Sequence, residues 1–68
     1  MGRSYDELRR KILGKYGNLG PFAGELGIQP GTLSLKLQGR TDWKREEIEK
    51  TANLLDLDAT EVWLIFFA

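Results

Sequence analysis

The fold of this chain is decided by residues 19–37, which read LGPFAGELGIQPGTLSLKL. Apolar residues recur there at helical spacing on both sides of a break: Phe22, Ala23, Leu26, Leu33 and Leu37. Gly27 stands at the break, where a residue without a Cβ can take a left-handed conformation and end a helix. Pro30 suits the first position of a following helix, because that position needs no N–H donor. The stretch therefore predicts two short helices joined by a turn at residues 27–29.

Two helices that cross steeply over so short a turn need a small residue at the point of approach, and Ala23 supplies it. Ile28 and Leu33 are placed to hold the second helix against the first. These features together predict a helix-turn-helix over about residues 19–38.

The segment before this motif predicts another helix. Ser4 and Glu7 have the spacing of a capping box, so we expect this helix to begin at Ser4. Its apolar stripe is predicted at spacings of three and four, from Tyr5, Leu8, Ile12 and either Leu13 or Tyr16. Gly14 and Gly17 bracket its end, and Asn18 is expected to cap the first helix of the motif.

Two more helices are predicted after the motif. Trp43 precedes Ile48 by five residues, which fits a hydrophobic staple at the start of a helix whose stripe continues through Ala52 and Leu55. Asp58 and Glu61 form a second capping box, which starts a short helix through residues 62–67. With 68 residues and 41% hydrophobic content, the chain predicts one domain over residues 1–68, an all-α fold of five helices.

Composition narrows the functional classes. The chain has no cysteine and no histidine, so we expect no thiolate metal site, no cofactor and no enzyme activity. Glu46 and Glu47 are adjacent and do not share a helix face; they suit the first turn of a helix instead. The longest apolar run, residues 62–67, is far shorter than the ~20 residues of a membrane span, and the first residues do not resemble a signal peptide. A cytoplasmic protein is expected.

The charges are divided along the chain although the net charge is zero. Residues 1–45 hold nine Lys/Arg and four Asp/Glu, whereas residues 46–68 hold one and six, which gives +5 and −5. This division suggests a basic face for an anionic partner. Ordinary solvated helix surfaces would explain it equally well.

Several segments carry a resemblance to a known family: Phe22-Ala23, Leu26-Gly27-Ile28, Thr32-Leu33-Ser34-Leu35-Lys36-Leu37, Glu47-Ile48-Glu49-Lys50 and Phe66-Phe67. Over almost its full length the chain resembles short phage and prophage regulators of the Cro type, which are repressor-like, XRE-type helix-turn-helix proteins. The resemblance implies a compact lambda-repressor-like fold. It also implies a dimeric transcriptional regulator that binds operator half-sites on double-stranded DNA, with the second helix of the motif in the major groove.

Carried over by position, the base-reading positions are Gln29, Pro30, Gly31, Ser34, Leu35 and Gln38, with Thr32 as a further candidate. Pro30 and Gly31 have no side-chain donor or acceptor, and Leu35 can offer only apolar contact, for instance to a thymine methyl. The candidate phosphate contacts are Asn18, Lys36, Arg40, Lys44 and Arg45. Each of these cations is as readily explained as solvated surface, and Leu35 as a widened core stripe.

The weak polar inventory of the second motif helix leaves an alternative function open. The chain could act as an antirepressor or modulator that binds a partner repressor protein instead of DNA. Apolar and aromatic side chains would anchor such a contact, and the candidates for it, or for a homodimer interface, are Leu35, Trp63 and Phe67. Val62, Ile65 and Phe66 are expected in the core of the domain.

Overall fold

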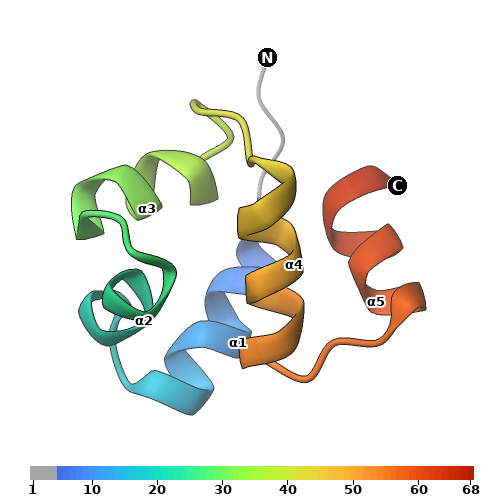
Figure 1. Cartoon of the computed structure of the whole chain (residues 1–68), viewed down its shortest axis with the longest axis horizontal. Helices are drawn as coiled ribbons and strands as arrows, with labels where there is room; N and C mark the ends of the chain where they lie inside the picture. Colours follow the sequence, from blue (N-terminus) through green and yellow to red (C-terminus); the bar gives the residue numbers. More distant parts are fainter. Residues whose placement is uncertain (1–4) are drawn as a thin grey trace.

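The computed structural model describes residues 5–68, which contain helices and no strand. The elements in chain order are α1 Asp6–Tyr16, α2 Leu19–Leu26, α3 Pro30–Leu37, α4 Arg45–Leu54, α5 Ala59–Val62 and a π-helix, η1 Trp63–Phe67. Helices α1 and α4 occupy the middle of the molecule, with α2 and α3 on one side and α5 on the other (Figure 1). The prediction of an all-α fold with five helices is confirmed. We call residues 59–67, which comprise α5 and η1, the terminal helix.

Helices α2 and α3 form the predicted helix-turn-helix. Gly27 adopts the left-handed conformation at φ 80° and ψ 26°. The N–H of Ile28 donates to the carbonyl of Ala23 at 3.0 Å, and that of Gly27 to the carbonyl of Gly24 at 3.1 Å, which is the Schellman pattern. Pro30 occupies the first turn of α3. The turn between the two helices is therefore closed by its own backbone hydrogen bonds.

One hydrophobic cluster joins the helices. Its fully buried side chains include those predicted for the inner faces of the first three helices: Leu8, Ile12, Phe22, Ala23, Leu33 and Leu37. Tyr16 packs against this cluster with its ring centroid 5.3 Å from that of Phe22, whereas Leu13 is exposed. The stripe of α1 thus continues through Tyr16. Ser4, expected to cap α1, lies outside the described residues, and α1 begins at Asp6.

An aromatic group connects the α3–α4 loop with both ends of the chain. The ring of Trp43 lies 5.2 Å from that of Phe66 and 5.9 Å from that of Tyr5, both in edge-to-face geometry. Trp43 and Ile48 pack against the core and hold the two positions of a hydrophobic staple around the cap residue Lys44. The side chain of Trp43 therefore anchors the α3–α4 loop to the core.

The terminal helix begins as predicted and ends differently. Asp58 Oδ1 accepts from the N–H of Glu61 at 2.8 Å, and Glu61 Oε1 accepts from the N–H of Asp58 at 3.0 Å, which confirms the capping box. Only residues 59–62 are α-helical; the next five form a π-helix. Ile65 and Phe66 are buried, as expected, and Val62 is partly buried against the core. Over residues 5–68, no helix combines the length and apolar character that a bilayer span requires.

Candidate nucleic-acid interface

The outward face of α3 is short and open. Gly31, Leu35 and Gln38 follow one another at spacings of four and three, so they share the face opposite the buried Leu33. Leu35 is 42% exposed, which contradicts its interpretation as part of the core stripe. The centre of this face is therefore an apolar side chain, flanked by a position without a side chain and by an amide.

The remaining base-reading candidates differ in access. Gln29 precedes α3 in extended conformation and is exposed, as is Pro30. Gln38 Nε2 donates to Ser34 Oγ at 3.1 Å, so these two side chains form one polar unit on the last turn of α3. Thr32 and Ser34 are half-buried on the flanks of the helix. Ser34, Leu35 and Gln38 thus lie on one surface, whereas Thr32 lies on the other flank of α3.

Lys36 is not part of this surface, and its assignment as a phosphate contact is wrong. Its side chain is 4% exposed, and its Nζ lies 3.0 Å from Glu47 Oε1 and 2.8 Å from the carbonyl oxygen of Asp42. The ammonium also lies 6.0 Å from the centre of the Trp43 ring. A spacing of three from Leu33 already placed Lys36 on the inner stripe of α3, and Glu47 is the partner that this burial requires.

One carboxylate oxygen of Glu47 accepts hydrogen bonds from two donors. Its Oε1 accepts from the backbone N–H of Lys44 at 2.8 Å as well as from Lys36. Burial raises the pKa of this carboxyl, but the Lys44 N–H and the Lys36 ammonium favour the charged form more strongly, and the pKa is lowered from its ordinary value of 4.5. The carboxylate therefore stays ionised and ties the start of α4 to the end of α3.

The predicted phosphate contacts other than Lys36 lie exposed around α2 and the α3–α4 loop. Arg40 and Lys44 form no ion pair with any residue of the described part of the chain. Arg45 Nε lies 3.3 Å from Glu49 Oε2, but both side chains are largely exposed and such pairs contribute little. Asn18 Oδ1 accepts from the N–H of Gly20 at 3.0 Å, which confirms it as the cap of α2.

The other two interface candidates belong to a second surface. Trp63 and Phe67 are 59% and 56% exposed, and their rings stack with centroids 6.1 Å apart. Leu64 beside them is equally exposed; sequence analysis missed it, because an unbroken apolar run does not reveal which of its residues face outward. The terminal helix and α3 lie on opposite sides of the molecule (Figure 1), so Leu35 is not part of this aromatic surface.

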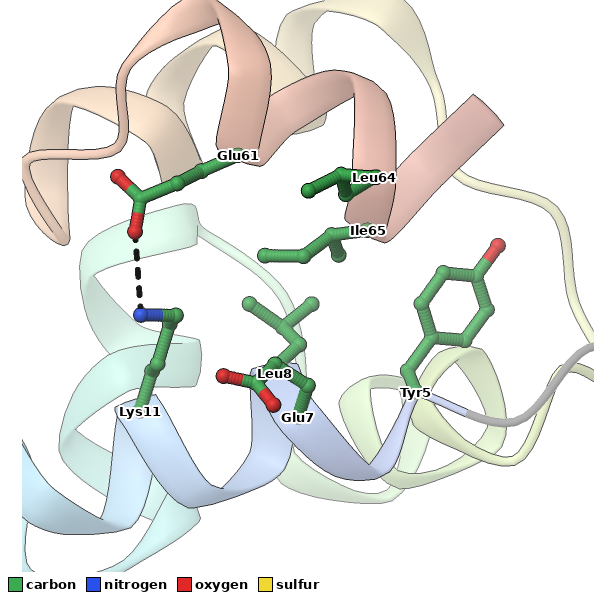
Figure 2. Close-up of a pocket in the computed structure, with 7 residues that line it drawn as sticks. All are labelled: Tyr5, Glu7, Leu8, Lys11, Glu61, Leu64 and Ile65. Carbon is green, nitrogen blue, oxygen red and sulfur yellow. Dashed lines mark hydrogen bonds and ion pairs between the residues drawn. The ribbon is translucent and has the colours of Figure 1, made fainter. Parts of the chain in front are cut away.

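A groove of about 500 Å³ separates α1 from the terminal helix. In Figure 2, Leu64 and Ile65 face Leu8 and Tyr5 across it, and an ion pair between Lys11 and Glu61 stands at one end. Lys11 Nζ lies 3.3 Å from Glu61 Oε2. The walls are polar and apolar in equal parts, and each of the three charged lining residues, Glu7, Lys11 and Glu61, has an ion-pair partner.

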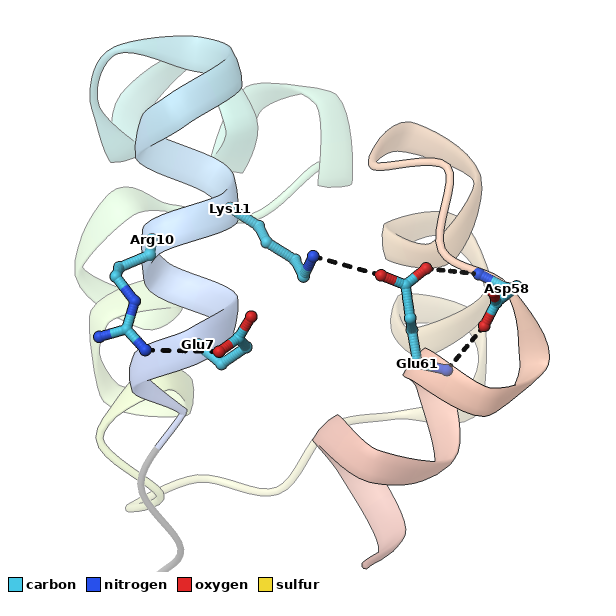
Figure 3. A network of polar contacts seen from close by, with 5 residues as sticks. All are labelled: Glu7, Arg10, Lys11, Asp58 and Glu61. Atoms are coloured by element: carbon cyan, nitrogen blue, oxygen red, sulfur yellow. Dashed lines mark hydrogen bonds and ion pairs between the residues drawn. The ribbon is translucent and has the colours of Figure 1, made fainter.

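Glu61 has two roles in this arrangement. It closes the capping box with Asp58 and, through its other oxygen, binds Lys11 of α1 (Figure 3). Glu7 Oε1 lies 3.4 Å from an Nη atom of Arg10 on α1, and both side chains are largely exposed. The capping box expected between Glu7 and Ser4 stays a prediction, because Ser4 lies outside the described residues. The start of the terminal helix is thus fixed to α1 by a partly buried ion pair whose acidic member also organises the helix start.

Comparison with known proteins gives a family without an assigned role. No curated protein sequence matches the chain. One family model, described as "Protein of unknown function (DUF739)", matches residues 1–68, which is the full length. The chain therefore belongs to the DUF739 family.

Proposed function

We propose that this protein is a cytoplasmic transcriptional regulator of the phage Cro type, which binds double-stranded operator DNA by placing α3 in the major groove. The proposal rests mainly on the exposed outward face of α3 and on the cations next to it. Its outward face is open, and the exposed cations Arg40 and Lys44 follow directly after it without ion-pair partners among residues 5–68. Cations at the end of a groove-binding helix are placed to meet the phosphates beside that groove.

The side chains of α3 support a modest base-reading role. The amides of Gln29 and Gln38 can each pair with the N6 and N7 positions of adenine. The bond between Gln38 and Ser34 orients the Gln38 amide before any DNA arrives. Leu35 offers an apolar contact to a thymine methyl, and Gly31 lets the helix backbone approach the bases closely. We therefore expect a preference for A·T pairs and moderate specificity.

Phosphate contacts would supply most of the affinity. At the N-terminus of α2 the backbone N–H of Leu19 can bind a phosphate, whereas that of Gly20 bonds Asn18 and Pro21 has none. Asn18 retains its Nδ2 donor because its cap bond uses only Oδ1. Arg40, Lys44 and Arg45 would contact the backbone on the other side of α3. These three cationic contacts predict a slope of about −3 for log K against log salt concentration.

The test is a fluorescence anisotropy titration of labelled duplexes from the region upstream of the gene, with shuffled duplexes of the same composition, at two salt concentrations. We expect Gln38→Ala to reduce the preference for the upstream duplex. Arg40→Gln should weaken binding to all duplexes and reduce the salt slope by about 1. Lys50→Gln on α4 is the matched control, because it removes the same charge from an exposed site away from α3. Absence of salt-dependent binding by the wild-type protein would contradict the proposal.

Operator binding of this type requires two copies, and the aromatic surface of the terminal helix supports one interface for them. A dimer formed through Trp63, Leu64 and Phe67 would leave α3 of each copy accessible, because α3 lies on the opposite side of the molecule (Figure 1). Sedimentation equilibrium should show a dimer that dissociates in Trp63→Ala/Phe67→Ala. Leu13→Ala is the control, since Leu13 is also exposed but lies on α1.

A partner repressor protein is the second candidate, favoured by the exposure of Leu35 at the centre of α3 and of the aromatic surface. Buried aromatic and aliphatic anchors carry most of the affinity in protein interfaces. Co-purification with the repressor encoded next to the gene, after nuclease treatment, separates the two functions. Loss of the complex in Leu35→Asp would favour this candidate, whereas retention only in the presence of DNA would refute it.

A further inference from the structure

Lys36 combines a full charge with almost complete burial. It lies on the last turn of α3, on the same stripe as Leu33 and Leu37, and its side chain is 4% exposed. Burial of an ammonium without partners would be strongly unfavourable. The fold must therefore supply hydrogen-bond acceptors around the Lys36 Nζ.

The partners of Lys36 all belong to the α3–α4 loop and the start of α4. Its Nζ donates to the carbonyl of Asp42 at 2.8 Å and to Oε1 of Glu47 at 3.0 Å. The Trp43 ring lies beside it, at 6.0 Å, and is itself packed against Phe66. One side chain of α3 therefore fixes the loop at consecutive residues 42 and 43 and fixes α4 at its first turn.

The buried ion pair of Lys36 and Glu47 does more to fix the position of the loop than to raise the free energy of unfolding. A buried ion pair is often no more stabilising than an apolar pair of the same volume, because both charges lose their hydration. Its hydrogen bonds are directional, however, and hold the groups that they join in one relative position. The element that Lys36 holds in position is the loop that carries Arg40 and Lys44.

Arg40 is also fixed from the side of α3. Gly39 takes a left-handed conformation at φ 77°, and the N–H of Arg40 donates to the carbonyl of Leu35 at 3.0 Å. Lys44 is fixed by the bond from its N–H to Glu47, the same carboxylate that receives Lys36. The backbones of both exposed cations are thus held relative to α3: that of Arg40 by α3 itself, and that of Lys44 through Glu47, which Lys36 binds.

We propose that Lys36 is a positioning residue for DNA binding. It never touches DNA; it orients the end of the α3–α4 loop so that Lys44, beside Arg40, meets the phosphates that flank the groove occupied by α3. This inference rests on the proposed function. A direct phosphate contact by Lys36 is excluded by its burial and by the carboxylate that it already binds.

The experiment compares the wild-type protein with Lys36→Met/Glu47→Gln, which removes both charges, leaves the net charge unchanged, keeps the side-chain length at position 47 and shortens that at position 36 by one atom. We expect the variant to keep its helical circular dichroism spectrum. Its affinity for the upstream duplex should fall about tenfold near 0.1 M salt, and its salt slope should decrease by about 1, as for the loss of one phosphate contact. Glu7→Gln/Arg10→Met is the matched control, because it removes an exposed ion pair of α1 and should leave affinity and slope unchanged.

A double-mutant cycle separates positioning from a general structural effect. Lys44→Gln should weaken binding several-fold in the wild-type protein and much less in the Lys36→Met/Glu47→Gln variant, because Lys44 would no longer be held against its phosphate. If the double variant does not fold, Lys36→Gln/Glu47→Gln replaces it; it also removes both charges, keeps a polar group at both positions and should reduce the slope by less.

The outcomes distinguish this inference from the proposed function. Wild-type affinity and slope in the variant, or an undiminished effect of Lys44→Gln in it, would overturn the positioning role while DNA binding stands. Absence of DNA binding by the wild-type protein would overturn both.

Discussion

Thr51 provides a sharp test of how the scaffold around the helix-turn-helix is packed. It lies on α4, which packs against α2, and it is 0% exposed. Its Oγ1 is buried and has no hydrogen-bond partner within residues 5–68. Thr51→Val replaces this hydroxyl with a methyl group of similar size, so it removes the unpaired polar atom and changes little else.

The magnitude follows from two opposing effects. Burial of a hydroxyl without a partner costs about 1–3 kcal/mol, and an additional buried methyl contributes about 0.8 kcal/mol. Close packing around a fully buried side chain takes back part of this gain, because the methyl is slightly larger than the hydroxyl. We expect a net increase of about 1 kcal/mol in the free energy of unfolding. In a domain of this size that corresponds to a rise in Tm of roughly 4–8 °C.

Thermal and urea unfolding followed by far-UV circular dichroism measures this change. Thr51→Ser is the matched control, because it keeps the hydroxyl and removes the methyl, and it should lower the free energy of unfolding by about 1 kcal/mol. A lower Tm for Thr51→Val than for the wild-type protein would refute the reasoning. It would mean that the hydroxyl has a partner in solution, such as a carbonyl one turn earlier in α4.

Three further predictions concern the free energy of unfolding. The pKa of Glu47 is lowered from 4.5 in the folded protein, so its stabilising contribution is present above that pH and is lost as the pH falls through the folded pKa. Urea titrations at several pH values should show this loss of stability in the wild-type protein and a smaller loss in Glu47→Gln. Gly14→Ala should raise the free energy of unfolding by about 0.5–1 kcal/mol, since a Cβ there meets no atom within 4 Å, whereas Gly27→Ala should lower it by about 1 kcal/mol because the φ of Gly27 is +80°. Equal effects of the two variants in thermal scans would contradict the assigned conformations. Asp56 holds a left-handed conformation at φ 54° after α4, so Asp56→Gly should raise Tm by a few degrees, and a fall would show that the exposed contact with Lys15 matters more.

The helix-turn-helix was predictable because its signals are local. A glycine at position 27 ends a helix through backbone conformation alone, and Pro30 and Asn18 act within one turn of their own positions. The capping box at Asp58 is equally local, and it was confirmed at both of its hydrogen bonds. The inner faces of α2 and α3 followed from helical spacing, because each of these stripes has a single apolar side.

The candidate site was predictable only in part. The exposed positions on α3 followed from the same periodicity, yet Leu35 could be assigned to either face until its exposure was known. Lysine is usually a surface residue, so Lys36 was placed outside although its spacing from Leu33 favoured the inner stripe. Its burial depends on the carbonyl of Asp42 in the following loop and on the Glu47 carboxylate, which lies eleven residues away on another helix.

The sequence by itself determined where the helices start and stop and which residues form the helix-turn-helix, because caps, turn glycines and spacing act within a few residues. The tertiary structure decided the surroundings of side chains whose neighbours are distant in sequence: Lys36 is buried and holds the α3–α4 loop, and the Thr51 hydroxyl is buried without a hydrogen-bond partner among residues 5–68. It also decided the two faces of the terminal helix. An unbroken apolar run has no polar side. Only packing against α1 and Trp43 buries Ile65 and Phe66 and leaves their neighbours Trp63, Leu64 and Phe67 exposed.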